Sequence, residues 1–191
     1  GGGTAYMNTV DKNGLGVSLI QSNFHGIGSR IGVGSFGFFL HNRGCGFNLD
    51  SGHPNYLTPG RKPLHTLSPT IWSKNGNLEF IAGTRGGRYQ PQLLIQTILP
   101  YIQKSDSFEE IIKEPRWVIE NFSSDTISKL RFEKINNEDL EILLKKGHEV
   151  EVENKFNKAY GPISIIYKKD DGNFEGVCDV RVGTEKVFNS F

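Results

Sequence analysis

Residues 4–22 read TAYMNTVDKNGLGVSLIQS, and this stretch decides the fold class. Residues 5–10 and 17–21 have the alternation and the β-branched content of strands. The segment between them, Asp11-Lys12-Asn13-Gly14, is typical of a tight turn. We therefore expect a β-hairpin near the beginning of the chain.

The remaining chain predicts more hairpins, with helices between them. Hairpins are expected from residues 70–73 with 78–82, around an Asn-Gly turn, and from residues 162–168 with 173–178, around Asp170-Asp171-Gly172. The spacing of apolar residues predicts helices over 91–102, 107–113 and 137–146, the second capped by Ser107 and the third ended by Gly147. Short strands are expected at 38–40, 117–120, 130–134 and 149–152. Strands followed by helices and again by strands indicate an α+β or layered fold.

Charge and hydropathy argue against two classes of partner. The 191 residues carry 22 Lys and Arg against 21 Asp and Glu, a net charge of +1, which offers no electrostatic basis for binding nucleic acid. No run of eighteen apolar residues is present, so no membrane partner is expected. Since the chain begins Gly1-Gly2-Gly3-Thr4, without Met or a signal peptide, we expect a segment of a longer precursor. Any targeting signal would lie upstream, and we favour the cytoplasm over the periplasm or the extracellular space.

The five histidines do not form a metal-binding pattern. No two of them are spaced i,i+4 on a predicted helix, and most lie in predicted loops. We expect no metal and no cofactor. His65 alone is kept as a candidate for a substrate pocket.

Five motifs occur in an order that resembles a known family. They are residues 4–14, 17–29, 40–47, 59–70 and 83–92. Together they resemble the small, catalytic subunit of the γ-glutamyltransferases over essentially the whole chain. The resemblance implies an N-terminal-nucleophile hydrolase with a four-layer αββα sandwich. Residues 4–191 would be its C-terminal, small-subunit half, and residues 1–3 the end of the precursor segment. The upstream large-subunit segment would be the partner, in a heterodimer or a dimer of heterodimers.

The resemblance assigns catalytic roles to four residues. Thr4 matches the nucleophile that self-cleavage exposes, Ser22 a supporting hydroxyl, and Gly86 and Gly87 the pair whose main-chain N–H groups form the oxyanion hole. The chemistry agrees with these roles. A threonine hydroxyl is a weak nucleophile that needs a base, and a free α-amine, with an ordinary pKa of about 7.7–8.0, can serve. Glycine lets the main chain approach a substrate closely.

The predicted substrate pocket departs from the best-known members of the family. Their acidic residue for the α-amino group falls at Gly46, their paired serines at His65 and Thr66, and their asparagine at Phe24 or Asn23. The substrate would be a small-molecule amide or a γ-glutamyl compound. Arg43, if it faces the pocket, favours a carboxylate, although a purely structural arginine is equally compatible. The candidate substrate-binding residues are Asn23, Asn42, Arg43, His65, Thr66 and Gln90.

Two functions of different classes remain open at this stage. One is an active amidohydrolase or acyltransferase with an N-terminal threonine. The other is a catalytically silent, uncleaved homologue that acts as a binding or structural protein. Near the end of the chain, Asp179 and Arg181 are expected to form a structural ion pair and to take no part in chemistry.

Overall fold

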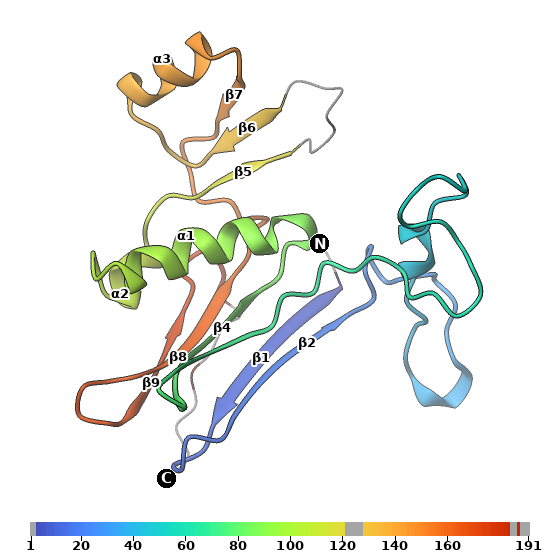
Figure 1. Cartoon of the computed structure of the whole chain (residues 1–191), viewed down its shortest axis with the longest axis horizontal. Helices are drawn as coiled ribbons and strands as arrows, with labels where there is room; N and C mark the ends of the chain where they lie inside the picture. Colours follow the sequence, from blue (N-terminus) through green and yellow to red (C-terminus); the bar gives the residue numbers. More distant parts are fainter. Residues whose placement is uncertain (1–2, 121–127, 184–186, 188–191) are drawn as a thin grey trace.

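The computed structural model describes residues 3–120, 128–183 and 187. Residues 1 and 2 of the expected three-residue leader lie outside them, as do three short stretches of the expected small-subunit half. Figure 1 shows an α+β fold, as expected, built on a two-stranded, a four-stranded and a three-stranded sheet. The strands are β1 (Thr4–Val10), β2 (Gly16–Ser22), β3 (Thr70–Lys74), β4 (Asn77–Thr84), β5 (Trp117–Ile119), β6 (Lys129–Phe132), β7 (Glu149–Val152), β8 (Ile163–Lys168) and β9 (Phe174–Cys178). The helices are α1 (Gln90–Ile102), α2 (Phe108–Ile111) and α3 (Asn137–Lys145), with 3₁₀ turns η1 (Gly34–Phe36), η2 (Arg43–Gly46) and η3 (Gly87–Tyr89).

Strand β4 lies at the centre of the molecule because both of its faces are covered. The four-stranded sheet has the order β3-β4-β8-β9, with antiparallel neighbours throughout. Successive side chains of a strand point to opposite faces. Phe80 and Ala82 face the helices and belong to the main core, whereas Ile81 and Gly83 face the β1–β2 hairpin. The hairpin and helix α1 therefore lie on opposite faces of the same sheet.

The main core fills the space between this sheet and the helices. The Phe80 ring lies 5.3 Å from the Phe108 ring and 5.4 Å from the Tyr101 ring, both edge to face. Such aromatic pairs add to the stabilisation from apolar burial. Around them pack buried residues of α1, α2, β5, β8 and β9: Leu93, Leu94, Ile98, Ile111, Ile112, Val118, Ile163, Ile165 and Val177.

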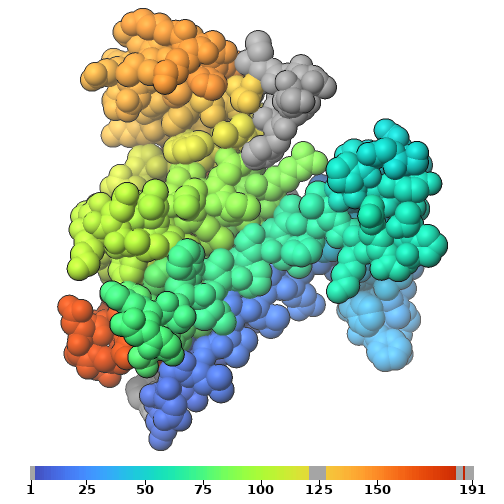
Figure 2. All heavy atoms as spheres, viewed as in Figure 1, coloured from blue at the N-terminus to red at the C-terminus, as the bar shows by residue number. Residues whose placement is uncertain are grey.

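The three-stranded sheet β5-β6-β7 forms a separate lobe with α3. Strands β5 and β6 are antiparallel, and α3 links β6 to its parallel neighbour β7. Asn136 caps α3 by accepting the Asp139 N–H at 2.8 Å, and Gly147 ends it with φ +84°. Figure 2 shows this lobe, in yellow and orange, at one end of the molecule; the loops of residues 23–69, in light blue and teal, form another.

Two sequence predictions were wrong in detail. Residues 38–40 form no strand: Phe39 makes only an isolated bridge with Gly32, and residues 38–40 are exposed. An apolar run becomes a strand only when a neighbouring strand pairs with it along its length. Here, turns at glycine residues separate residues 38–40 from segments that could pair with them. The predicted helix 107–113 is shortened to α2; Ser107 is its N-cap residue, as predicted, but the Ser107 side chain makes no capping hydrogen bond.

The described residues provide three layers of the expected sandwich. They are the α1–α2 layer, the four-stranded sheet and the β1–β2 hairpin. The outward face of the hairpin carries exposed apolar side chains, with Met7 49%, Val17 48% and Leu19 48% exposed. A second helical layer over that face is not present in the described part of the chain. No described helix is both long and apolar enough to cross a membrane.

Candidate active site

The two hydroxyls expected at the site meet at one end of the β1–β2 hairpin. Thr4 and Ser22 are opposite each other in the strand register, and Thr4 Oγ1 lies 2.7 Å from Ser22 Oγ. Ser22 Oγ also accepts the Phe24 N–H at 3.0 Å. Because a hydroxyl has one hydrogen to donate and two lone pairs to accept with, Ser22 can make both contacts at once. Ser22 therefore orients the Thr4 hydroxyl.

The peptide bond before Thr4 is fixed by the main chain. The Gly3 N–H donates to Gly26 O at 3.1 Å, and the Gly3 carbonyl accepts the Asn23 N–H at 3.1 Å. A Cβ at position 3 would lie 2.3 Å from Gly26 O, so only glycine fits. A fixed donor on a carbonyl oxygen stabilises the negative charge that develops when a nucleophile attacks that carbonyl. The Gly3 carbonyl is thus polarised next to the Thr4 hydroxyl.

The predicted glycine pair lies in the loop that joins β4 to α1. Gly86 has φ +132° and Gly87 φ +57°, conformations that L side chains rarely adopt. The turn η3 then leads directly into α1, which has a proline in its first turn. The first N–H groups of a helix lack intrahelical partners and lie at the positive end of its dipole. This loop can therefore offer main-chain donors to an anionic oxygen.

Two close contacts orient the hairpin on the central sheet. Gly16, at the far end of the hairpin from Thr4, packs on Ile81: a Cβ there would lie 2.5 Å from Ile81 Cδ1. Nearer Thr4, the Tyr6 ring covers Gly83, where a Cβ would lie 2.1 Å from Tyr6 Cε2. The hairpin therefore runs along β4 from Ile81 toward Gly83 and beyond. Its Thr4 end points to the end of β4 where the glycine loop begins (Figure 1).

The turn that precedes β8 packs directly against this loop. Thr84 Oγ1 lies 2.9 Å from Arg85 O and 2.8 Å from Pro162 O. Gly161 has φ +68°, and a Cβ on it would lie 2.1 Å from Thr84 Oγ1 and 2.6 Å from Arg85 O. Any side chain at position 161 would push the glycine loop away from its place.

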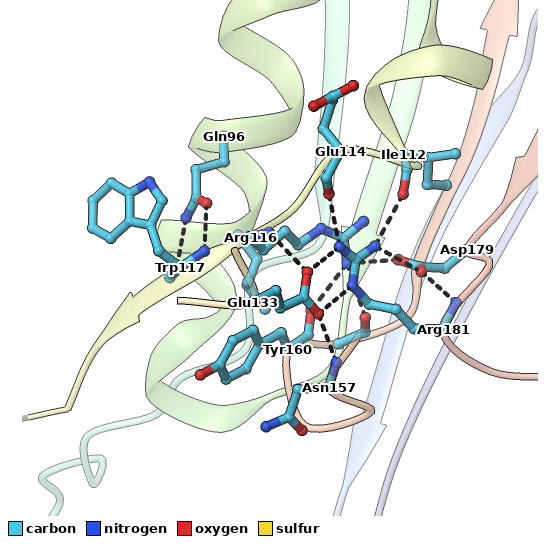
Figure 3. Close-up of polar contacts among 12 residues, drawn as sticks. Gln96, Ile112, Glu114, Arg116, Trp117, Glu133, Asn157, Tyr160, Asp179 and Arg181 are labelled. Carbon is cyan, nitrogen blue, oxygen red and sulfur yellow. Dashed lines mark hydrogen bonds and ion pairs between the residues drawn. The ribbon is translucent and has the colours of Figure 1, made fainter. Parts of the chain in front are cut away.

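A buried network of charged side chains supports the turn that precedes β8 (Figure 3). Arg116 Nη1 lies 2.6 Å from Asp179 Oδ2 and donates to Tyr160 O at 3.0 Å. Arg181 Nη1 lies 3.2 Å from Asp179 Oδ1, and Arg181 also pairs with Glu133. The ion pair predicted between Asp179 and Arg181 is therefore confirmed. Each of these four charged residues is buried.

The network is suited to a structural role. Burial lowers the pKa of Arg116 to about 10, although the adjacent Asp179 charge opposes this shift. Arg116 thus remains protonated at neutral pH and keeps its bonds to the carbonyls of Tyr160 and Gly161, each 3.0 Å long. Arg116 and Glu133 were not predicted from the sequence. One feature of the sequence could have indicated that they are buried: each of the two lies next to an aromatic residue of a predicted strand.

Three of the candidate substrate residues lie in contact with the residues around Thr4 and Ser22. Asn23 donates its N–H to Gly3, and its carbonyl accepts the Asn42 N–H at 3.2 Å. Asn42 Oδ1 accepts the His25 N–H at 3.0 Å. Arg43 is buried, and its guanidinium carbon lies 5.2 Å from the centre of the Phe24 ring. These residues form one continuous set of contacts with Ser22 and Thr4.

The other three candidates are hydrogen-bonded among residues 65–68 and the beginning of α1. Gln90 is buried, and its Oε1 accepts the Ser68 N–H at 3.0 Å, which fastens residues 65–68 to the beginning of α1. His65 Nδ1 accepts the Leu67 N–H at 3.2 Å, and Thr66 O lies 3.5 Å from Ser68 Oγ. Their roles in binding substrate stay predictions. Within residues 3–120, 128–183 and 187, no group of three or more His, Cys, Asp or Glu side chains could hold a metal ion.

Comparison with known proteins identifies relatives over nearly the whole chain. The gamma-glutamyltranspeptidase family model matches residues 1–188. The oxamate amidohydrolase proenzyme of Klebsiella pneumoniae is 34% identical over 181 residues, which are 94% of this chain and 34% of that protein. The glutathione hydrolase-like YwrD proenzyme of Bacillus subtilis is 34% identical over 182 residues, 95% of this chain and 35% of that protein. The chain therefore spans about a third of the length of the curated relatives it matches.

Solved structures agree with the fold. The gamma-glutamyltranspeptidase of Pseudomonas nitroreducens, complexed with L-DON, superposes with a TM-score of 0.79 at 21% identity, over 96% of this chain and 99% of that one. The cephalosporin acylase of Bacillus halodurans superposes with a TM-score of 0.75 at 29% identity, over 87% of this chain and 30% of that one. The N-terminal-nucleophile fold predicted from the sequence is thereby confirmed.

Proposed function

This chain belongs to the gamma-glutamyltranspeptidase family, and we propose that it is the nucleophile-bearing part of an amide hydrolase or acyltransferase that cuts its own precursor before Thr4. The observation that carries the proposal is the geometry at the peptide bond between Gly3 and Thr4. The Thr4 hydroxyl is 2.7 Å from Ser22 Oγ, and the Gly3 carbonyl is held by the Asn23 N–H at 3.1 Å.

Self-cleavage would proceed through an ester between Gly3 and Thr4. Thr4 Oγ1 attacks the Gly3 carbonyl carbon, and the Asn23 N–H stabilises the oxyanion. As the peptide bond breaks, the hydroxyl proton passes by way of Ser22 or water to the departing Thr4 nitrogen. Water then hydrolyses the ester. The products are a Gly3 carboxylate and a Thr4 residue with a free α-amine and a free hydroxyl.

Amide hydrolysis would use the α-amine that cleavage releases. The amine accepts the proton of Thr4 Oγ1, directly or through water, and the oxygen attacks the substrate carbonyl. The N–H groups of Gly86 and Gly87 hold the oxyanion, a role supported by their positive φ angles and their place before α1. The leaving amine takes the proton from the Thr4 ammonium group. Water, or an acceptor amine, then attacks the acyl-enzyme with the α-amine again acting as base.

The partner would be the upstream segment of the same precursor. The proenzyme relatives are about three times as long as this chain, and the exposed apolar residues Met7, Val17 and Leu19 form the outward face of the hairpin. Covering such a face with a further layer is the usual way in which a sheet excludes water from both sides. Amides are the substrates named for the relatives, oxamate and glutathione among them.

The test follows the mass of the full-length protein and of two variants, Thr4→Ala and Thr4→Ser, over many hours of incubation. We expect the wild-type and Thr4→Ser proteins to yield a fragment beginning at residue 4, and the Thr4→Ala protein to stay whole. Amide hydrolysis should appear only with the cut protein. It should increase with pH through the ordinary range of an α-amine pKa, about 7.7–8.0. A folded wild-type protein that stays whole would support the silent homologue instead.

A further inference from the structure

Arg43 carries a buried positive charge for which the described residues provide no hydrogen-bond partner at Nη1 or Nη2. The residue is 8% exposed at the beginning of η2. Within the part of the chain that the structure describes, neither Nη1 nor Nη2 has a hydrogen-bond partner. Leaving a guanidinium buried without an anion is costly, so buried charges in proteins are paired or bind a ligand. Arg43 is therefore available to pair with an anionic group that the described residues do not supply.

The guanidinium is connected to Thr4 through Phe24 and Ser22. Its carbon is 5.2 Å from the centre of the Phe24 ring, and the Phe24 N–H donates to Ser22 Oγ at 3.0 Å. Ser22 Oγ in turn lies 2.7 Å from Thr4 Oγ1. Phe24 has φ +75°, a conformation that is uncommon for a bulky residue and that tends to occur at functional sites. Phe24, through its ring and its main-chain N–H, and Ser22 thus link Arg43 to Thr4 in one series of contacts.

The neighbouring residues offer no counter-charge. The main-chain N–H of Arg43 donates to His41 Nδ1 at 3.3 Å, a contact that leaves the guanidinium untouched. Gly46 cannot readily be replaced by an acid, since a Cβ there would lie 3.0 Å from Leu64 O and 3.4 Å from Leu64 N. Position 46, where the family resemblance places the acidic residue that binds an amine, therefore carries no acidic group near Arg43 in the sequence.

We propose that Arg43 binds a carboxylate on the acyl part of the substrate, so that the substrates are monoamides of short dicarboxylic acids. The planar guanidinium can take both carboxylate oxygens in parallel hydrogen bonds. The Phe24 ring beneath it supports the charge through a cation–π contact. This inference rests on the proposed function, and it names the substrate class of the same site.

The experiment compares amides that differ only in this carboxylate. Oxamate and succinamate are paired with pyruvamide and levulinamide, in which a methyl ketone replaces the carboxylate, and ammonia release is measured. The full-length protein is tested as wild type, Arg43→Met and Arg43→Lys. Arg30→Met is the matched control, because Arg30 is an exposed cation of the same loop region. The mass of each product reports whether cleavage before Thr4 took place.

We expect wild type and Arg30→Met to prefer at least one of the two acids by about ten- to a hundredfold in kcat/KM over its methyl ketone, as for a hydrogen-bonded charge. Arg43→Met should lose this preference, which is compared only among proteins whose mass shows that they have been cut before Thr4. Arg43→Lys, which keeps the charge without the planar fork, should lie between them, and it carries the test if the Met variant does not fold.

Three results would overturn the inference. In the first, the cut wild-type protein hydrolyses acids and ketones equally well, so the proposed function stands and the carboxylate site does not. In the second, Arg43→Met keeps the preference and only loses stability, which assigns the cation to an anion of the upstream segment. In the third, the wild-type protein is uncut and inactive on every amide, and the proposed function fails together with the inference.

Discussion

The contact between Tyr6 and Gly83 sets how the hairpin that carries Thr4 lies on the central sheet, and Gly83→Ala should disrupt it. The added Cβ would lie 2.1 Å from Tyr6 Cε2 and 2.2 Å from Tyr6 Cζ. Ordinary contact begins near 3.4 Å, so the ring must withdraw by at least 1.3 Å. The ring cannot easily turn aside, because its hydroxyl bonds to Ser18 Oγ at 3.0 Å on the neighbouring strand.

The magnitude follows from this displacement. Overpacking of a well-packed site costs about 1–3 kcal/mol of unfolding free energy. Since Thr4 is only two residues before Tyr6, the hairpin should carry the nucleophile with it, and a misplacement of about 1 Å can cost about a hundredfold in rate. We therefore expect Gly83→Ala to slow cleavage before Thr4 by a larger factor than the loss of stability explains.

A double-mutant cycle with Tyr6→Ala isolates the contact. Urea unfolding is measured in a Thr4→Ala background, so that every protein remains a single uncut chain. The double variant should be about 1–3 kcal/mol more stable than the sum of the two single effects predicts, because the new methyl occupies space that the ring has left. Gly183→Ala is the control, since a Cβ there meets nothing within 4 Å. Strictly additive effects, or a Gly83→Ala protein as stable as this control, would refute the proposed packing.

Three further predictions concern the glycine loop, the charge network and the hydroxyl pair. Gly161→Ala should destabilise the uncut protein by about 1–3 kcal/mol more than Gly172→Ala, since both positions have positive φ but only the first has neighbours in the way; equal urea midpoints would contradict this. Asp179→Asn leaves two buried arginines without the carboxylate that they share, and it should lower the unfolding free energy by about 3–5 kcal/mol. Glu110→Gln, in an exposed pair, should lower it by less than about 1 kcal/mol. Comparable falls in the unfolding temperature of the two variants would count against a stabilising role of the network. Ser22→Ala should slow cleavage before Thr4, and Ser22→Thr should preserve it, as followed by mass over time; an unchanged rate for the Ala variant would remove Ser22 from the site.

The hairpins could be predicted because their signals are local. Gly14, Gly76 and Gly172 end three of the turns, and each has a positive φ in the structure, between 79° and 87°. The alternation of apolar and polar residues on either side of each turn then predicted the strands. Residues 38–40 have the same local character and form no strand, because no neighbouring strand pairs with them along their length.

The contacts between layers could not be predicted, because they join residues far apart in the chain. Nothing in the residues around Gly83 indicates that an aromatic ring from β1 covers it. Likewise, the sequence predicted an ion pair of Asp179 with Arg181 but gave no sign that Arg116 is buried against the same carboxylate. The roles of Thr4, Ser22 and the glycine pair came from a resemblance, and a resemblance did not reveal that Arg43 is buried without an acid.

Thr4 would then attack two different carbonyl groups, that of Gly3 in self-cleavage and later that of the substrate. The hydrogen bonds of Gly3 explain how the two carbonyl groups can use the site one after the other. In the uncut chain, the Gly3 carbonyl accepts the Asn23 N–H and the Gly3 N–H donates to the Gly26 carbonyl. Gly3 therefore extends the hairpin by one residue. The glycine loop after β4 is a separate set of donors on another layer of the sandwich. Cleavage would free the Thr4 amine, and departure of the Gly3 end would uncover the hairpin edge beside Ser22. The base and the space for a substrate would therefore arise together, which is a physical reason for the uncut chain to be inactive.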